Sequence, residues 1–132
     1  MKNELFLFDT HALLFWTNRE LVSNEYIDFF DQQDLKANIR VSSITFWEIA
    51  LLAKKGKIEI EDTYRWSIEL VNNTNIQIID PTYKEMIDST LLPDHHKDPF
   101  DRLLISQTVN RQLKLVTKDE SIKQYDVPVF WR

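Results

Sequence analysis

The sequence predicts an α/β fold in a single domain, with a mainly parallel central sheet flanked by helices. Its 132 residues correspond to the size of one domain. Short apolar runs without polar alternation, such as residues 5–8, are typical of strands buried on both faces of a parallel sheet. Segments with helical spacing separate these runs, and strands that alternate with helices favour parallel pairing.

The strands are predicted from short apolar or β-branched runs. In chain order they cover residues 5–8, 39–41, 76–79, 113–117 and 127–130. The first and third runs read as fully buried strands because they carry no polar alternation. Asp9 ends the first strand, and Asp119 follows the fourth.

The helices are predicted from apolar periodicity and from capping residues. In chain order they cover residues 12–16, 24–34, 44–54, 63–71, 81–88 and 99–112. Ser23 and Asp62 are of the types that cap helix N-termini. Asp80 and Asp98 each precede a proline, which favours an N-cap followed by Pro at the first helical position.

The helix over residues 44–54 has the clearest pattern. Ile44, Trp47 and Leu51 recur at helical spacing, which predicts that they form its buried face. The basic residues Lys54, Lys55 and Lys57 follow at its C-terminus, where they complement the helix dipole. These lysines are either solvated charges or contacts for a nucleic-acid backbone.

Composition excludes several classes of function. The chain has no cysteine, which excludes disulfides, thiolate nucleophiles and cysteine zinc sites and fits a cytoplasmic protein. Its single glycine excludes the glycine-rich loops that bind nucleotide phosphates. Charged residues interrupt the apolar N-terminus, so we expect no signal peptide and no membrane span. The net charge of −5 argues against a general nucleic-acid coat but allows a local basic patch.

Four acids occupy positions that ordinary surface charges do not explain. Asp9 and Asp119 follow strands, and ligands of open α/β sheets bind beyond the carboxyl ends of the strands. Glu48 interrupts an otherwise apolar stretch, and Asp101 lies in the first turn of an apolar helix. Asp9 is the hardest to explain as a surface residue, because an unpaired carboxylate in an apolar segment is costly to bury.

Helix capping is the competing interpretation of these acids. Residues 45–48 fit a capping box, and residues 98–101 fit an N-cap, a proline and an acid at the third helical position. For Asp98 capping is the favoured role, whereas for Glu48 and Asp101 it competes evenly with a functional one. Asp119 could simply belong to a turn.

Convergence of the acids would require a cation. Two carboxylates about 4 Å apart repel by roughly 4 kcal/mol at an effective dielectric near 20, more than a cap contributes. An all-oxygen ligand set suits Mg²⁺ or Mn²⁺, which retain waters and accept phosphate oxygens as further ligands. The acids therefore indicate phosphoryl-transfer chemistry.

The ordered acids and their flanking residues resemble PIN-domain ribonucleases, specifically VapC-like toxins of type II toxin-antitoxin systems. The similar segments are residues 7–14, 41–50, 96–105 and 115–119, closing on residues 127–131. The resemblance spans nearly the whole chain, so residues 1–132 are expected to form one PIN domain.

The resemblance implies a metal-dependent endoribonuclease that hydrolyses RNA phosphodiester bonds with metal-activated water. The residues that would hold Mg²⁺, or Mn²⁺, are Asp9, Glu48, Asp101 and Asp119, with Asp98 as a secondary ligand or only a helix cap. Thr10 and Thr117 would support these ligands, although Thr10 could instead cap the first helix. A cognate antitoxin protein and a homodimer are the further partners that the family implies.

Other residues near these acids carry weaker signals. Arg102 and Lys118 could contact an RNA backbone. His11 is expected to be a partly buried, hydrogen-bonded residue. His95 and His96 lie in a loop without metal-ligand spacing to another histidine, so we assign them no catalytic role. The tryptophans are expected to pack in the core.

Two alternatives to a nuclease remain open. A catalytically silent PIN-like binding or regulatory module would use the acids only as caps and as contacts for basic groups of a partner. A phosphoaspartate enzyme would also place Asp9 at a strand end, with Lys118 nearby. Its Asp-x-Asp motif is missing, however, because His11 occupies the second position.

Overall fold

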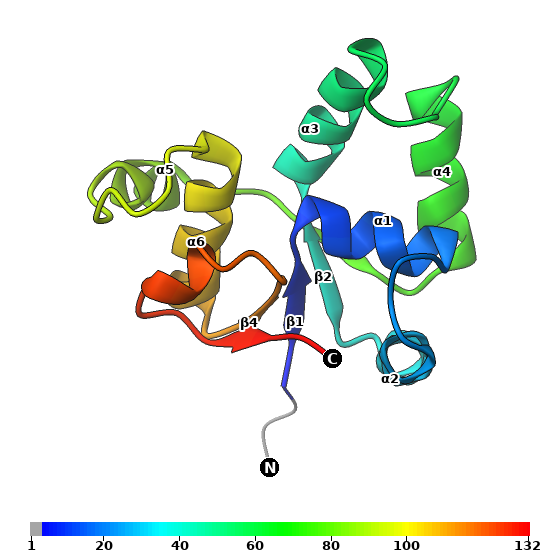
Figure 1. The fold of residues 1–132 in the computed structure, drawn as a ribbon, viewed down its shortest axis with the longest axis horizontal. Coiled ribbons are helices and arrows are strands. Elements are labelled where there is room, and N and C mark those ends of the chain that lie inside the picture. Colours follow the sequence, from blue (N-terminus) through cyan, green and yellow to red (C-terminus); the bar gives the residue numbers. More distant parts are fainter. Residues whose placement is uncertain (1–3) are drawn as a thin grey trace.

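The central sheet is parallel throughout its five described strands, as predicted. The structure is a computed structural model and describes residues 4–132. The strands are β1 (Phe6–Phe8), β2 (Ile39–Ser42), β3 (Gln77–Ile79), β4 (Lys114–Val116) and β5 (Val129–Phe130). Their order is β3-β2-β1-β4-β5, and in register Phe6 lies opposite both Ile39 and Lys114. The first strand of the chain therefore occupies the centre of the sheet (Figure 1).

Helices flank the sheet on both sides (Figure 1). They are α1 (Thr10–Asn18), α2 (Asn24–Leu35), α3 (Ser43–Lys54), α4 (Thr63–Asn73), α5 (Tyr83–Thr90) and α6 (Pro99–Arg111), with a 3₁₀ turn η1 (Ile122–Gln124). In Figure 1, α5 and α6 lie on one side of β1, and α1 to α4 lie on the other. Across residues 4–132, every helix is too short or too polar to cross a bilayer.

Strand β1 is buried on both faces, which is the reason for its continuous apolar sequence. Phe6 and Phe8 point into a core formed with α1 and α2, where Phe30 contacts both rings edge-on. Leu7 points to the opposite face and packs with Leu104 of α6. All three β1 side chains are at most 1% exposed, so the chain continues from β1 directly into a buried environment at Asp9.

The predicted caps are present at three helices and wrong at a fourth. Ser23, Asp62 and Asp98 each accept a backbone N–H at the start of α2, α4 and α6. Helix α5 begins later than predicted, because Thr82 rather than Asp80 is its N-cap. Thr82 and Glu85 form a reciprocal capping box, which satisfies two backbone N–H groups at the start of the helix.

Two burial predictions are also wrong. Residues 76–79 were expected to form a fully buried strand, yet Ile78 is 45% exposed because β3 lies at the edge of the sheet. Trp47 was expected in the core but is 62% exposed. The buried face of α3 instead carries Thr45 and Ile49, so Trp47 points outward and meets the ring of Phe100 at 5.1 Å.

Candidate active site

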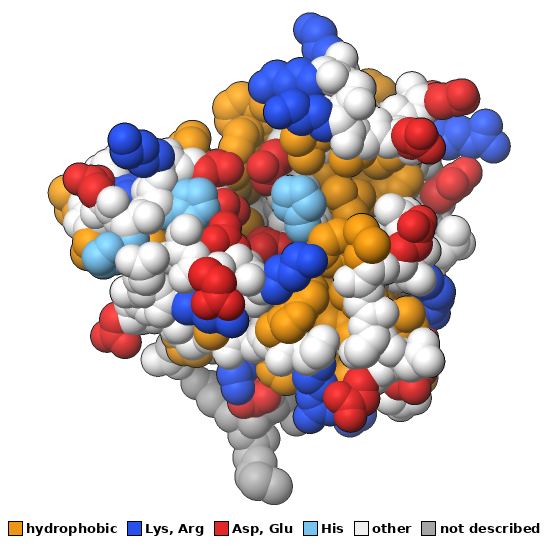
Figure 2. Space-filling view, viewed as in Figure 1, with side chains coloured by type: hydrophobic (Ala, Val, Ile, Leu, Met, Phe, Trp, Pro, Cys, Tyr) orange, Lys and Arg blue, Asp and Glu red, His pale blue; other side chains and the backbone are white. Residues whose placement is uncertain are grey.

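The topology brings the ends of three helices and two strands to one edge of the sheet. Because the strands are parallel, β1 and β4 end at the same edge, and α1 and α3 begin there. Helix α6 runs back toward the start of β4, so its own N-terminus also lies at this edge. Figure 2 shows acidic and histidine side chains gathered in the middle of this face, at the place where β1 ends in Figure 1.

Asp9 is held directly after β1. Its side chain is the N-cap of α1 and accepts the backbone N–H of Ala12 at 2.7 Å. Burial raises the pKa of Asp9, and a hydrogen bond from the Thr117 side chain opposes that rise. The Thr117 hydroxyl also accepts the backbone N–H of Asp119 at 3.1 Å. Thr117 therefore connects Asp9, which follows β1, with Asp119, which follows β4.

Glu48 projects from α3 toward α1. Its Oε1 accepts the Thr10 hydroxyl at 2.5 Å, although the two residues are 38 positions apart. Burial raises the pKa of Glu48, with the Thr10 hydrogen bond acting in the opposite direction. The capping-box interpretation of Glu48 is wrong, because the N-cap of α3 is Ser42. Thr10 is likewise not a cap, since Asp9 has that position.

Asp101 lies at the electrostatic centre of the group. Burial, together with the negative charges of Asp98, Asp9, Glu48 and Asp119, raises its pKa to about 8. Asp98 caps α6 through its bond to the Phe100 N–H at 2.9 Å, so its predicted capping role is confirmed. Its charge nevertheless acts on Asp101, which places Asp98 beside the other acids.

Asp119 differs from the other acids because it is well supplied with donors. Its Oδ1 accepts the backbone N–H of Ser121 at 2.8 Å, and its Oδ2 lies 3.1 Å from Nε2 of His96. Burial raises its pKa, but the hydrogen bonds from Ser121 and His96 outweigh this and lower the pKa below its ordinary value. Asp119 is thus a turn residue and a member of the acidic group at once.

His96 is the residue that sequence reasoning missed. Its Nε2 lies 3.0 Å from Asp101 Oδ2 as well as 3.1 Å from Asp119 Oδ2. Spacing between histidines, the signal considered in the sequence, does not detect such a contact. A usable signal was that His96 precedes the N-cap Asp98 by two residues, which lets its ring reach the start of α6.

The donor set fits a hard divalent cation. Asp9, Glu48, Asp101 and Asp119 offer carboxylate oxygens, the ligands that Mg²⁺ and Mn²⁺ prefer. The N-termini of α1, α3 and α6 point to the same edge and partly offset the negative charge. Burial and the neighbouring acids nevertheless raise the pKa of Asp101 to about 8, so the protein's own positive groups do not offset these two effects.

Comparison with known proteins identifies the fold family. The PIN domain family model matches residues 6–128, which is nearly the whole chain. The chain belongs to the PIN domain family. A curated relative, Ribonuclease VapC22 of Mycobacterium tuberculosis (strain ATCC 25618 / H37Rv), is 23% identical over 128 residues, covering 92% of each chain.

Solved structures of low sequence identity share this PIN fold. One is VapBC2 from Rickettsia felis bound to a promoter DNA fragment, with a TM-score of 0.73 and 17% identity over 97% of this chain and 99% of that one. Another is DNA-bound VapBC from Salmonella typhimurium, with a TM-score of 0.71 and 14% identity over 97% and 98%.

The basic residues around the acids of this PIN domain have different surroundings. Lys118 is exposed, and its Nζ lies 4.7 Å from the Phe15 ring centre and 6.0 Å from that of Trp131. The guanidinium of Arg102 instead donates to the carbonyls of Leu92, Pro93 and His96. Arg102 therefore holds the loop before α6, and fewer of its donors remain for a substrate.

Other predicted contacts lie farther away or differ in exposure. Three lysines lie at the C-terminal end of α3, about 18 Å along that 12-residue helix from the sheet edge. Lys54 is the last residue of the helix, and Lys55 and Lys57 follow it. His11 is exposed rather than partly buried, and its ring lies 6.1 Å from that of Phe15.

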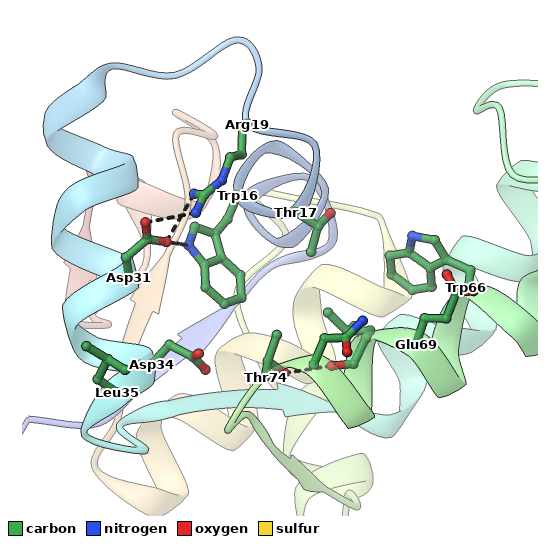
Figure 3. A pocket seen from close by; sticks show the side chains of 11 residues that line it. Trp16, Thr17, Arg19, Asp31, Asp34, Leu35, Trp66, Glu69 and Thr74 are labelled. Atoms are coloured by element: carbon green, nitrogen blue, oxygen red, sulfur yellow. Dashed lines mark hydrogen bonds and ion pairs between the residues drawn. The ribbon is translucent and has the colours of Figure 1, made fainter.

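A separate concavity of about 470 Å³ lies between α1, α2 and α4 (Figure 3). Asp31 accepts the indole N–H of Trp16 at 3.0 Å and pairs with Arg19 at one end of it. Its lining residues include Trp66 and Glu69 but none of the acids at the strand ends. The acidic group, and not this pocket, is the candidate active site of the PIN domain.

Proposed function

We propose that this PIN domain is a metal-dependent endoribonuclease and the toxin of a type II toxin-antitoxin module. The observation that carries the proposal is the convergence of Asp9, Glu48, Asp98 and Asp119 around Asp101, whose pKa is raised to about 8 by burial and by their charges. Such a group is costly without a cation and suits one with oxygen ligands. The similarity to a protein named as a ribonuclease supports the same activity.

In this proposal Asp9, Glu48, Asp101 and Asp119 hold the ion, with Asp98 at its border. The chemistry that a bound Mg²⁺ or Mn²⁺ supplies is activation of a water and stabilisation of charge on the phosphate. The water oxygen bonds to phosphorus while the bond from phosphorus to the leaving ribose oxygen breaks, and the proton that the water loses is balanced by one gained by that ribose oxygen.

The chain's other residues prepare this site and receive the substrate. The Thr10 hydroxyl orients Glu48, and Thr117 orients Asp9. Lys118 extends its ammonium over the ring of Phe15, where it can neutralise an RNA phosphate next to the acids. We assign the phosphate contact to Lys118 before Arg102, because Arg102 already binds loop carbonyls.

An antitoxin protein is the proposed partner. The structural relatives named as VapBC assemblies support this, and an acidic centre of this kind can be neutralised by a basic side chain. Coexpression with the neighbouring reading frame tests the proposal, which predicts a stable complex without nuclease activity. Recovery of the toxin alone, still active, would contradict it.

A homodimer is the proposed assembly of the free chain. Helix α5 exposes the side chains of Tyr83 and Ile87, and its C-cap Leu91 is exposed beside them; the exposed fractions are 80%, 57% and 76%. A second copy of the chain would cover such a surface. Light scattering should report twice the mass of the chain, and a monomer at high concentration would reject the dimer.

The nuclease is tested by incubating purified, antitoxin-free protein with end-labelled total RNA in Mg²⁺, in Mn²⁺ and in EDTA. We expect discrete fragments in the metal buffers only, and none from an Asp101→Asn protein purified in the same way. Cleavage in EDTA would refute the metal-dependent mechanism. Absence of both cleavage and metal binding would instead favour a silent binding or regulatory module.

A further inference from the structure

Every polar atom of His96 has a partner in the structure. Its backbone N–H donates to the Tyr125 hydroxyl at 2.9 Å, and its carbonyl accepts Arg102 Nη1 at 3.0 Å. Its ring Nδ1 accepts the backbone N–H of Asp98 at 3.1 Å. Its Nε2 faces Asp101 and Asp119 at 3.0 and 3.1 Å. The side chain is only 17% exposed, so the ring has a single well-defined orientation.

The contact at Nδ1 determines where the ring carries its proton. A nitrogen that accepts a backbone N–H has no proton of its own, so the proton of the neutral ring is on Nε2. That N–H donates to Asp119 Oδ2, and Asp101 Oδ2 lies 3.0 Å from the same nitrogen. We propose that His96 is a positioning residue that donates a hydrogen bond to Asp119 and sets its ring beside Asp101, and that it is not a ligand of the ion. This inference rests on the metal site of the proposed function.

The distances at Nε2 alone do not separate a donor from a ligand. Ligands about 2.1 Å from an octahedral ion lie about 3 Å from their neighbours, which is also a hydrogen-bond length. Ligation through Nε2 would, however, move the ring proton to Nδ1 and set it against the N–H of Asp98. That bond lies at the N-cap of α6, so ligation would disturb the helix that carries Asp101.

The surrounding loop is built to keep His96 in this position. Arg102 donates to the carbonyls of Leu92 and Pro93 at 2.8 and 3.0 Å, in addition to that of His96. The Tyr125 hydroxyl donates to the Pro93 carbonyl at 2.7 Å. These bonds connect the loop to α6 and to the segment after η1. Arg102 therefore holds the loop in place next to the site, and we assign it no contact with the substrate.

The ring proton can be located directly in the unmodified protein. Long-range ¹H–¹⁵N NMR of ¹⁵N-labelled protein should show His96 with a proton on Nε2 and none on Nδ1. The pattern should persist when Mg²⁺ is added to saturation. A proton on Nδ1 in the metal-free protein would overturn the inference, and so would loss of the Nε2 proton on Mg²⁺ binding, because that result means ligation. His96→Gln identifies the signals, and His95 provides a reference ring.

Variants then measure what the donor contributes. His96→Ala removes it and should weaken Mn²⁺ binding, measured by calorimetry, by about 10- to 100-fold. His96→Gln keeps an N–H at a similar reach and should restore affinity to within about fivefold. Because the amide oxygen of Gln can also ligate a hard cation, the ring-proton NMR is the measurement that separates a donor from a ligand. His95→Ala, a neighbouring change whose ring instead contacts Tyr125 at 5.1 Å, should bind like the wild type.

The possible results separate this inference from the nuclease proposal. Equal losses in His96→Ala and His96→Gln, with circular dichroism showing both folded, would overturn the donor role, as would unchanged binding in His96→Ala. None of these readouts uses RNA. A protein that binds Mn²⁺ through this arrangement but cuts no RNA would contradict the nuclease alone, whereas a wild type that binds no Mg²⁺ or Mn²⁺ would overturn both.

Discussion

Replacing Asp101 by Asn should stabilise the metal-free protein while it abolishes activity. The pKa of Asp101 is raised from an ordinary 3.8 to about 8 by burial and by the acids around it. The folded state therefore binds a proton that the unfolded chain has released, throughout the range from about pH 4 to about pH 8. Stability is full below this range and falls as the pH rises through it.

The size of the effect follows from the same numbers. Each pKa unit corresponds to about 1.4 kcal/mol, so an unscreened rise from 3.8 to about 8 amounts to about 6 kcal/mol at pH 8. The Asp101 side chain retains 17% exposure, and water and salt screen part of the repulsion. We expect Asp101→Asn to gain about 2 kcal/mol at pH 8, or about 5–8 °C in Tm.

Thermal and urea unfolding in EDTA at pH 5 and pH 8 measure this. The wild type should lose stability between the two pH values, and Asp101→Asn should lose clearly less. Asp94→Asn is the control, because that side chain is 96% exposed and its removal should leave the pH dependence unchanged. If Asp101→Asn is less stable than the wild type at pH 8 in EDTA, the repulsion argument fails.

Three further predictions follow from other contacts. Thr10→Val should weaken Mn²⁺ binding, measured by calorimetry, about tenfold, because Glu48 loses its hydrogen bond. Thr10→Ser keeps the hydroxyl and should bind normally. Equal Mn²⁺ binding by the wild type and both variants would contradict this. Arg111→Met should lower the free energy of urea unfolding by about 3 kcal/mol, because it leaves the carboxylate of Glu85 buried without its ion-pair partner. Adding Glu85→Gln to that variant should recover part of the loss. A loss below about 1 kcal/mol would show that the ion pair contributes little to stability. Mg²⁺ at about 100 times its Kd should stabilise the wild type by about 2.7 kcal/mol at pH 8 and leave the stability of Asp101→Asn unchanged. A thermal shift of equal size in both proteins would mean that the ion binds at another site.

Local interactions explain why much of the fold could be predicted. A helix N-cap depends on one side chain and the backbone a few residues away, so Ser23, Asp62 and Asp98 could be assigned from their neighbours alone. The buried strand β1 was recognisable because a strand enclosed on both faces has no polar alternation. The error at Asp80 has a local cause too, since Asp80 and Thr82, two residues apart, are both of types that cap helices, and Thr82 is the N-cap.

The burial of individual side chains could be predicted less well. Helical spacing indicates that α3 has an apolar face, but two faces of α3 are apolar, and the sheet and α1 determine which of them is covered. Thr45 and Ile49 are buried as a result, and Trp47 is left outside. In the same way Ile78 is exposed because nothing pairs beyond β3 in the described sheet.

By itself the sequence determined the order of strands and helices, the ends of most helices, and which acids follow strands. These features depend on residues close together in the chain. Only the tertiary structure decided that Thr10 binds Glu48, 38 positions away, and that His96 reaches Asp119, 23 positions away. Hydrogen bonds require atoms at specific distances and directions, and the packing of the parallel sheet and its helices brings those distant atoms together.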